Sequence, residues 1–126
     1  MKLLHVLLAI LLIISLGSCE TTEKAEACAD TFFQEVIAGK HESASNYLAD
    51  KPLEKFNKIE VVKLLSINPE QGKLLSASKN TGFSTNIQNG VSTVQMPYEL
   101  TYENGTITYS VVVVDRGNGM KIEYLN

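Results

Sequence analysis

The spacing of the apolar residues changes once along this chain, and that change limits the folds it can adopt. Between positions 25 and 65, apolar residues recur every three to four positions, the period of an α-helix that buries one face. From Lys73 onward they alternate with polar residues, the period of a half-buried strand. Helices followed by strands predict an α+β fold, with N-terminal helices packed on one face of an antiparallel sheet.

Three helices are predicted in the first half of the chain. The first ends at Gly39, because glycine suits the position just after a helix. The second runs from His41 to Ala49, and the third has Pro52 in its first turn. The segment Asn68–Gly72 ends the helical pattern. The residues expected to face inward are Ala25, Cys28, Ala29, Phe32, Phe33, Val36, Ile37, Ala44, Tyr47, Leu48, Leu53, Phe56, Val61, Val62, Leu64 and Leu65.

Turn sequences divide the second half into three to five strands. Asn89-Gly90, Asn104-Gly105 and Arg116–Gly119 all favour tight turns. Positions 73–88 therefore supply either one long strand or two short ones. The strand residues expected to face inward are Val94, Met96, Tyr98, Leu100 and Tyr102, and the alternating residues Met120, Ile122 and Tyr124 are expected to form a last short strand.

Two features refine this sheet. Pro97 cannot donate a ladder hydrogen bond, which predicts a sheet edge or a bulge there. The run Val111–Val114 predicts a segment covered on both faces. Together the patterns predict one core that contains Phe32, Val36, Phe56, Val94, Tyr98, Leu100, Val113 and Ile122.

A short apolar segment, Leu3–Leu16, follows the positive charge of Lys2. It is shorter than the roughly 18–20 residues that span a bilayer, so a secretory signal is favoured over a buried helix or a membrane anchor. The junction Leu16-Gly17-Ser18-Cys19 resembles the lipobox of bacterial lipoproteins. That resemblance implies cleavage before Cys19, a diacylglyceryl thioether on its sulfur and frequent acylation of its new amino group.

The expected organisation is a signal peptide at 1–18, a lipidated tether at 19–24 and one domain at 25–126. Two acyl chains suffice for stable anchoring, and no membrane-spanning helix would remain after cleavage. Glu20 differs from the Asp that retains enterobacterial lipoproteins in the inner membrane, which favours the periplasmic face of the outer membrane. An extended tether of this length reaches about 20 Å at most, so the domain would stay close to the bilayer.

Loose motifs extend through the expected domain, in Ala29–Leu48, in Tyr98–Gly105, in the valine-rich strand and in Gly119–Ile122. They resemble small bacterial lipoproteins with an NTF2-like (cystatin-like, SnoaL-like) domain of unknown function. The resemblance implies a curved sheet wrapped around a long helix, forming a cone with a pocket. Two positions depart from it: Lys40 stands where Asp or Asn often caps a helix, and Met120 stands where Trp usually closes the core.

Composition excludes several classes of protein. The net charge of −3 and the lack of a basic run disfavour nucleic-acid binding. Two cysteines are too few for a disulfide-dense scaffold or a four-cysteine zinc site. The sequence contains no metal-ligand spacing, phosphate-binding loop or Ser-His-Asp arrangement, so no metal or cofactor is predicted.

An open cone would present aromatic and apolar side chains to a small apolar ligand, with tyrosine hydroxyls to orient it. The alternative is that the same residues belong to the core or its edge, as amphipathic tyrosines often do. The tyrosines considered for this role are Tyr47, Tyr98, Tyr102 and Tyr109. The predicted ligand-binding residues are Tyr47, Phe56, Met96, Tyr98 and Tyr109.

Other reactive residue types have ordinary interpretations. His41 follows Gly39 and is expected at the surface, and Cys28 is expected to be a buried, inert thiol, with pairing to a cysteine of another protein as the alternative. Glu99 and Glu103 are expected to face solvent, and Asp115 to serve a turn. None of these residues is predicted to be catalytic.

The sequence therefore predicts a lipid-anchored envelope protein whose domain binds a small apolar ligand or an envelope protein without catalysis. The inward positions of strand 94–102 carry no group that titrates near pH 7, which acid–base catalysis would need. One alternative is an enzyme of the SnoaL or ketosteroid-isomerase type, with an acid or base inside the cone. The other is an immunity or exclusion lipoprotein, which would use a surface patch.

Overall fold

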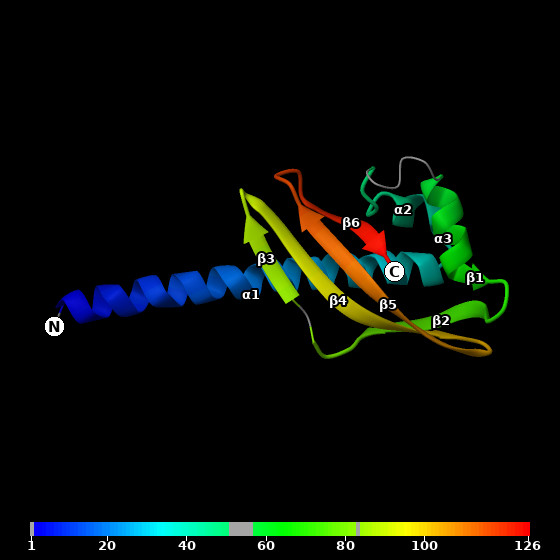
Figure 1. The fold of residues 1–126 in the computed structure, drawn as a ribbon, viewed down its shortest axis with the longest axis horizontal. Helices are drawn as coiled ribbons and strands as arrows, with labels where there is room; N and C mark the ends of the chain where they lie inside the picture. The colour runs from blue at the N-terminus through cyan, green and yellow to red at the C-terminus, as the bar shows by residue number, and fades with distance from the viewer. Residues whose placement is uncertain (1, 51–56, 83) are drawn as a thin grey trace.

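A computed structural model describes residues 2–50, 57–82 and 84–126, with side chains from Glu20 onward. In these residues three helices precede six strands, which confirms the predicted α+β order. Figure 1 shows α1 running behind the sheet, with α2 and α3 at the end of the molecule away from the N-terminus. The elements are α1 (Lys2–Ile37), α2 (His41–Ser45), α3 (Lys58–Ser66), β1 (Ile67–Asn68), β2 (Gly72–Lys79), β3 (Ser84–Gln88), β4 (Val91–Tyr102), β5 (Gly105–Asp115) and β6 (Met120–Leu125).

The first helix is longer than the sequence pattern predicts. α1 continues without a break through positions 20–24, where an extended tether was expected. A helix rises only about 1.5 Å per residue, less than half the reach of an extended chain, so Cys19 lies nearer to the domain than expected. None of the side chains at 20–24 is buried, and the buried core begins at Ala25.

The end of α1 confirms the role predicted for Gly39. This glycine has a φ of 78°, and its N–H donates to the carbonyl of Val36 at 3.1 Å. The N–H of Lys40 donates to the carbonyl of Glu35 at 2.9 Å, which completes a Schellman motif. Lys40 then forms the N-cap of α2 without a side-chain hydrogen bond, as expected of a residue that is not Asp or Asn.

The second helix is shorter than predicted, because α2 ends at Ser45 rather than at Ala49. The Ser45 hydroxyl donates to the carbonyl of Glu42 at 2.6 Å, a local bond that competes with helix continuation. The segment at 47–49 leaves the helix and lies beside β6, where Leu48 forms a parallel bridge. Ala44 and Leu48 are buried as predicted, and Tyr47 is half-buried.

The third helix begins at Lys58, after Asn57. The Asn57 side chain accepts a hydrogen bond from the N–H of Ile59 at 3.0 Å, a standard helix cap. The prediction that Leu64 faces inward is wrong, since its side chain is 61% exposed while Val62 and Leu65 carry the buried side of the helix. The expected first turn and its inward residues, Pro52, Leu53 and Phe56, lie outside the described residues.

All strand pairings are antiparallel, in the order β1-β2-β4-β5-β6. β3 also pairs with β4, on the side that β2 occupies further along. Positions 73–88 therefore form two strands, which confirms the second of the two alternatives. β4 and β5 pair in one register from Ser92 opposite Asp115 to Tyr102 opposite Gly105.

Pro97 lies in the central strand β4, but at a local gap in the pairing. Its carbonyl accepts from the N–H of Asn80 at 2.8 Å, so its imino nitrogen faces the same side, toward β2 and β3. On that side β2 pairs with β4 up to Tyr98, and β3 begins to pair at Gln95. The missing N–H thus falls between two partner strands, and the expectation of an edge holds locally.

The two Asn-Gly sequences form hairpins by different means. Asn89 and Gly90 have φ values of 54° and 76°, the pair of left-handed residues that a two-residue hairpin favours. Gly105 already belongs to β5, and the turn lies before it. A Cβ atom at Gly105 would lie 2.3 Å from Oε1 of Gln71, so close approach of a neighbour accounts for this glycine.

The predicted core is confirmed for the residues that the structure describes. Phe33 connects the helical and the sheet parts of this core, since its ring centroid lies 5.1 Å from those of both Phe32 in α1 and Tyr98 in β4. Three of the four residues in Val111–Val114 are buried, close to the predicted coverage of both faces. Phe56 lies outside the described residues. The predicted core residues that are buried are Phe32, Val36, Val94, Tyr98, Leu100, Val113 and Ile122.

Candidate functional site

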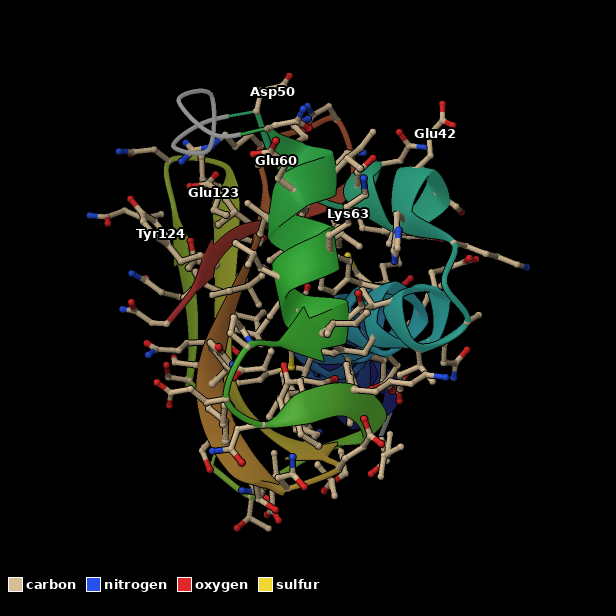
Figure 2. All side chains as sticks on the ribbon, turned by 90° about the vertical axis from the view of Figure 1, so that its right-hand side faces the viewer. Glu42, Asp50, Glu60, Lys63, Glu123 and Tyr124 are labelled. Carbon is tan, nitrogen blue, oxygen red and sulfur yellow. The ribbon has the colours of Figure 1, made fainter. Side chains whose placement is uncertain are left out.

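A cleft of about 1010 Å³ lies at the β6 edge of the sheet. It lies between the segment after α2, the start of α3, and the β5–β6 hairpin. Figure 2 shows Glu123 and Tyr124 on one side of α3 and Glu42 on the other. The residues that line the cleft are Asn46, Leu48, Ala49, Asp50, Lys58, Val114, Arg116, Asn118, Lys121, Glu123 and Tyr124.

A bulge in β6 determines how the side chains of Glu123 and Tyr124 line this cleft. Val113 lies opposite Ile122, but Val112 lies opposite Tyr124, so Glu123 is an extra residue in β6. The extra residue reverses the alternation beyond it. The alternation of Met120, Ile122 and Tyr124 therefore does not continue to Tyr124: its side chain is 50% exposed, whereas Glu123 is buried.

The segment at 47–49 covers part of the free edge of β6. The Ala49 N–H donates to the carbonyl of Ile122 at 2.8 Å, and the Ile122 N–H donates to the carbonyl of Tyr47 at 2.8 Å. These bonds satisfy backbone groups that an edge strand would leave open. They also place Asn46 and Asp50 on the rim of the cleft.

The central charged pair is Arg116 with Glu123. Nε of Arg116 lies 2.8 Å from Oε2 of Glu123, and Nη2 lies 3.1 Å from Oε1, which is a bidentate arrangement. The Glu123 side chain is 11% exposed and the Arg116 side chain 60%, so a buried carboxylate is neutralised by a cation at the surface. The hydrogen bond and charge of Glu123 raise the pKa of Arg116 further.

The other charged side chains of the cleft are also engaged. Lys58 donates to Asp50, and this hydrogen bond, together with the Lys58 charge, lowers the pKa of the Asp50 carboxyl. Nζ of Lys121 donates to the carbonyl of Asn46 at 2.6 Å. The cleft therefore offers paired charges and one exposed aromatic ring, an arrangement that can bind a ligand or a protein surface.

The predicted ligand-binding residues do not meet in this cleft. Met96 and Tyr98 have no exposed surface and face the core from β4. Tyr109 lies opposite Tyr98 on β5, shares its face and is half-buried, as is Tyr47. Phe56 lies outside the described residues. The structure thus places the described members of this set in the core or at its edge, the second of the two interpretations.

Two of the tyrosine hydroxyls have partners inside the fold. The Tyr98 hydroxyl donates to Oδ1 of Asp30 at 2.7 Å, and burial together with this carboxylate raises its pKa strongly. The Tyr102 hydroxyl donates to the carbonyl of Leu65 at 2.8 Å, and burial raises its pKa to about 12. Both hydroxyls therefore join helices to the sheet.

Cys28 and His41 lie close to their predicted positions. Cys28 is 8% exposed, its Sγ lies 3.7 Å from the carbonyl of Met120, and burial raises its pKa to about 11, as expected of an unreactive thiol. His41 is half-buried rather than fully at the surface, with Nε2 at 3.4 Å from the hydroxyl of Ser66. These two residues do not line the cleft.

The carboxylates singled out in the sequence serve the backbone. Oδ1 of Asp115 accepts from the N–H of Gly117 at 2.8 Å, which confirms its turn role. Oε1 of Glu103 accepts from the N–H of Lys73 at 2.7 Å while the side chain stays exposed, as predicted. Glu99 is partly exposed.

Sequence patterns missed Glu123, because simple alternation placed Tyr124 inward and Glu123 in solvent. One signal was present: Arg116 is the only arginine in the sequence, and it adjoins a turn from which a bidentate contact to a nearby strand is possible. Lys121, opposite Val114, belongs to the same missed set.

In the part of the chain that the structure describes, no cluster of His, Cys, Asp and Glu could hold a metal ion. The helices of that part include none with the length and apolar character needed to cross a membrane. No protein-family model, curated protein or solved structure matches this chain.

Proposed function

We propose that this chain is a bacterial lipoprotein precursor, cleaved before Cys19 and anchored through lipid on that residue, on the periplasmic face of the outer membrane. The observation that carries the proposal is the Leu16-Gly17-Ser18-Cys19 junction after a short apolar segment. The packing is compatible with cleavage there, because the buried core starts at Ala25 and no described side chain before it is buried.

Replacement of the proposed lipid-bearing residue tests this assignment. Cys19→Ala should move the protein from the membrane fraction to the soluble fraction and abolish incorporation of labelled palmitate. Cys28→Ala is the matched control, because it removes the other cysteine and should leave labelling unchanged. Labelling that persists in Cys19→Ala would refute the proposal.

We propose an NTF2-like fold for the domain at 25–126. Its support is a long helix against an antiparallel sheet, with the first strands after the helices, together with the motifs that resemble this family. An experimental structure of the lipidated protein tests it. A sheet that curves around α1 is expected, and a sheet that packs flat on the helix would contradict it.

The proposed role of the domain is to bind an envelope protein or a small ligand without catalysis. The paired state of the charged groups in the cleft supports binding, because a general acid or base needs a free position for a substrate proton. Tyr124, which is exposed and lines the cleft, supplies the kind of aromatic surface that interfaces favour.

Site-specific photo-crosslinking in living cells tests the cleft as the binding surface. A photoreactive residue at Tyr124 should give an adduct of one defined mass, and the same residue at Leu75 should not. The two positions are matched in exposure, at 50% and 53%, and only Tyr124 lines the cleft. Equal labelling at both positions would contradict binding in the cleft.

A further inference from the structure

One segment of the folded domain is free of charge. Positions 80–98 contain no Asp, Glu, Lys or Arg, although charged residues make up 20% of the chain. This segment includes β3, the turn at Asn89 and Gly90, and the first half of β4. Its polar groups are hydroxyls and amides, which are less costly to place at a lipid surface than carboxylates are.

The outer part of this segment is a surface rather than a piece of core. Four of the five side chains of β3 are exposed, and Ile87 has 60% of its surface in solvent. β3 and the start of β4 form a two-residue hairpin, which we call the β3–β4 hairpin (84–92). It presents one large aliphatic side chain, Ile87, among hairpin residues that carry no charge, and Asp115 lies one strand further, opposite Ser92.

The β3–β4 hairpin also lies beside the end of α1 that leads to Cys19. The hydroxyls of Thr22 and Thr85 are 3.5 Å apart, so β3 contacts α1 near position 22. Cys19 is three residues before Thr22, about 4.5 Å along the helix, and Asn89 is about 13 Å beyond Thr85 along the strand. Figure 1 shows β3 starting close to α1 and running obliquely away from it, with the turn between β3 and β4 at the end of the sheet that faces the N-terminus.

The exposed aliphatic side chains at the other end of the molecule have different surroundings. Ile67 is 63% exposed, close to the value for Ile87, but it lies opposite Lys73 in the β1–β2 pair. Figure 1 places β1 at the end of the molecule away from the N-terminus. Ile67 is therefore a matched reference for Ile87, with similar exposure but a charged neighbour and a distant position.

We propose that the β3–β4 hairpin contacts the bilayer that holds the lipid of Cys19, with Ile87 entering the interfacial region. The inference rests on the proposed lipid anchor. Bilayer surfaces that contain anionic lipids repel an acidic domain, so an uncharged edge beside the anchor is the face that can approach most closely. Partial burial of an aliphatic side chain then adds to attachment by the acyl chains.

Depth-dependent fluorescence quenching tests this contact. The full chain is expressed in bacteria as Ile87→Cys or Ile67→Cys, and the mature protein is isolated from the membrane fraction. Each variant is labelled with an environment-sensitive dye and placed in vesicles of phosphatidylethanolamine and phosphatidylglycerol that contain a lipid-borne quencher. The native protein without a new cysteine is the labelling control, because Cys19 is a thioether in the proposed form and Cys28 is buried.

The expected result is quenching several-fold stronger at position 87 than at position 67, with a blue-shifted emission at 87 only. A second pair of proteins isolates the role of the side chain: a dye at Gln88→Cys should lose most of its quenching when Ile87→Asp is added. Circular dichroism confirms that each variant is folded.

The outcomes separate this inference from the proposed anchor. Palmitate labelling with equal quenching at positions 87 and 67 overturns the hairpin contact and leaves the anchor intact. Quenching at Gln88→Cys that does not change with Ile87→Asp also overturns it. A protein that takes up no palmitate overturns both the anchor and the contact that depends on it.

Discussion

The central strand pair and the C-terminal strand of this sheet follow different rules. β4 and β5 pair at 11 consecutive positions without a shift, whereas β6 pairs with β5 at five positions and shifts once, at Glu123. β4 has partner strands on both sides, which hold its register. β6 has β5 on one side and only the short segment at 47–49 on the other, so an extra residue can be accommodated.

Functional side chains can arise in this fold where the sheet is less constrained. In β4 every second side chain from Val94 onward enters the core, and the alternation is not interrupted before the strand ends. In β6 the bulge directs the Glu123 carboxylate toward a partly enclosed position and the Tyr124 ring toward solvent. The candidate cleft exists because regular alternation fails at this edge.

The largest contrast should appear when an aromatic ring is removed from each region. Phe32 has no exposed surface and packs in the core that β4 and β5 cover, so Phe32→Ala should cost about 3–5 kcal/mol of unfolding free energy. Tyr124→Ala is the control in the cleft and should change stability by less than about 0.5 kcal/mol. Urea unfolding monitored by circular dichroism measures both. A loss below about 1 kcal/mol for Phe32→Ala would show that α1 does not pack as described.

Thiol reactivity sharpens the comparison where α1 meets β6. Burial raises the Cys28 pKa from 9.0 to about 11, so at pH 8 its thiolate fraction should be about 100-fold lower than that of a free thiol. The contribution of this thiol to stability is present below pH 9 and is lost as the pH rises through 11. Alkylation by iodoacetamide in a Cys19→Ala background, with and without urea, measures the effect. Equal rates in the two conditions would contradict the closed packing.

Removal of the Tyr102 hydroxyl tests the packing at the end of the β4–β5 pair. Tyr102→Phe leaves the buried carbonyl of Leu65 without its donor and should cost about 1 kcal/mol at pH 7. Because the folded pKa is about 12 and the ordinary value is 10.0, the native hydroxyl stabilises fully below pH 10, and this contribution declines as the pH rises through 12. The stability gap between the two proteins should therefore narrow above pH 10. Unfolding curves from pH 7 to pH 11.5 would show a constant gap if the hydroxyl were exposed.

Within the charged pair of the cleft, a small effect is expected when the carboxylate is removed. Glu123→Gln removes a carboxylate whose partner remains hydrated, so it should cost less than about 1 kcal/mol. Arg116→Gln should cost more, because it leaves the buried Glu123 carboxylate without its cation. Thermal unfolding of both variants at low and high salt measures the difference. The reverse order would show that Glu123 is not enclosed in solution.

Periodicity and turn chemistry predicted most of the fold, because both depend on neighbours along the chain. The alternation from Val94 to Tyr102, the Gly39 helix end and the Asn89-Gly90 turn all follow from local rules. The exposure of Leu64 was missed, since it depends on how α3 is rotated against the rest of the fold.

The candidate site was harder to predict for a physical reason. It combines side chains from the segment after α2, from the start of α3 and from β6, and it depends on one extra residue in a strand. A bulge leaves no mark in the hydrophobic pattern until the partner strand is known. Alternation alone therefore assigns Glu123 to the solvent face of the sheet and Tyr124 to the core face, the reverse of what the structure shows.

Pro97 has a consequence for how the sheet opens. Because its missing N–H lies where β2 ends and β3 begins, the two strands are attached to the same side of β4 by separate sets of hydrogen bonds. β3 contributes no buried side chain, so its amides should exchange with solvent by local fraying, while the amides between β4 and β5 exchange only in rarer, larger openings. The strand nearest the proposed anchor should therefore open without disturbing the core.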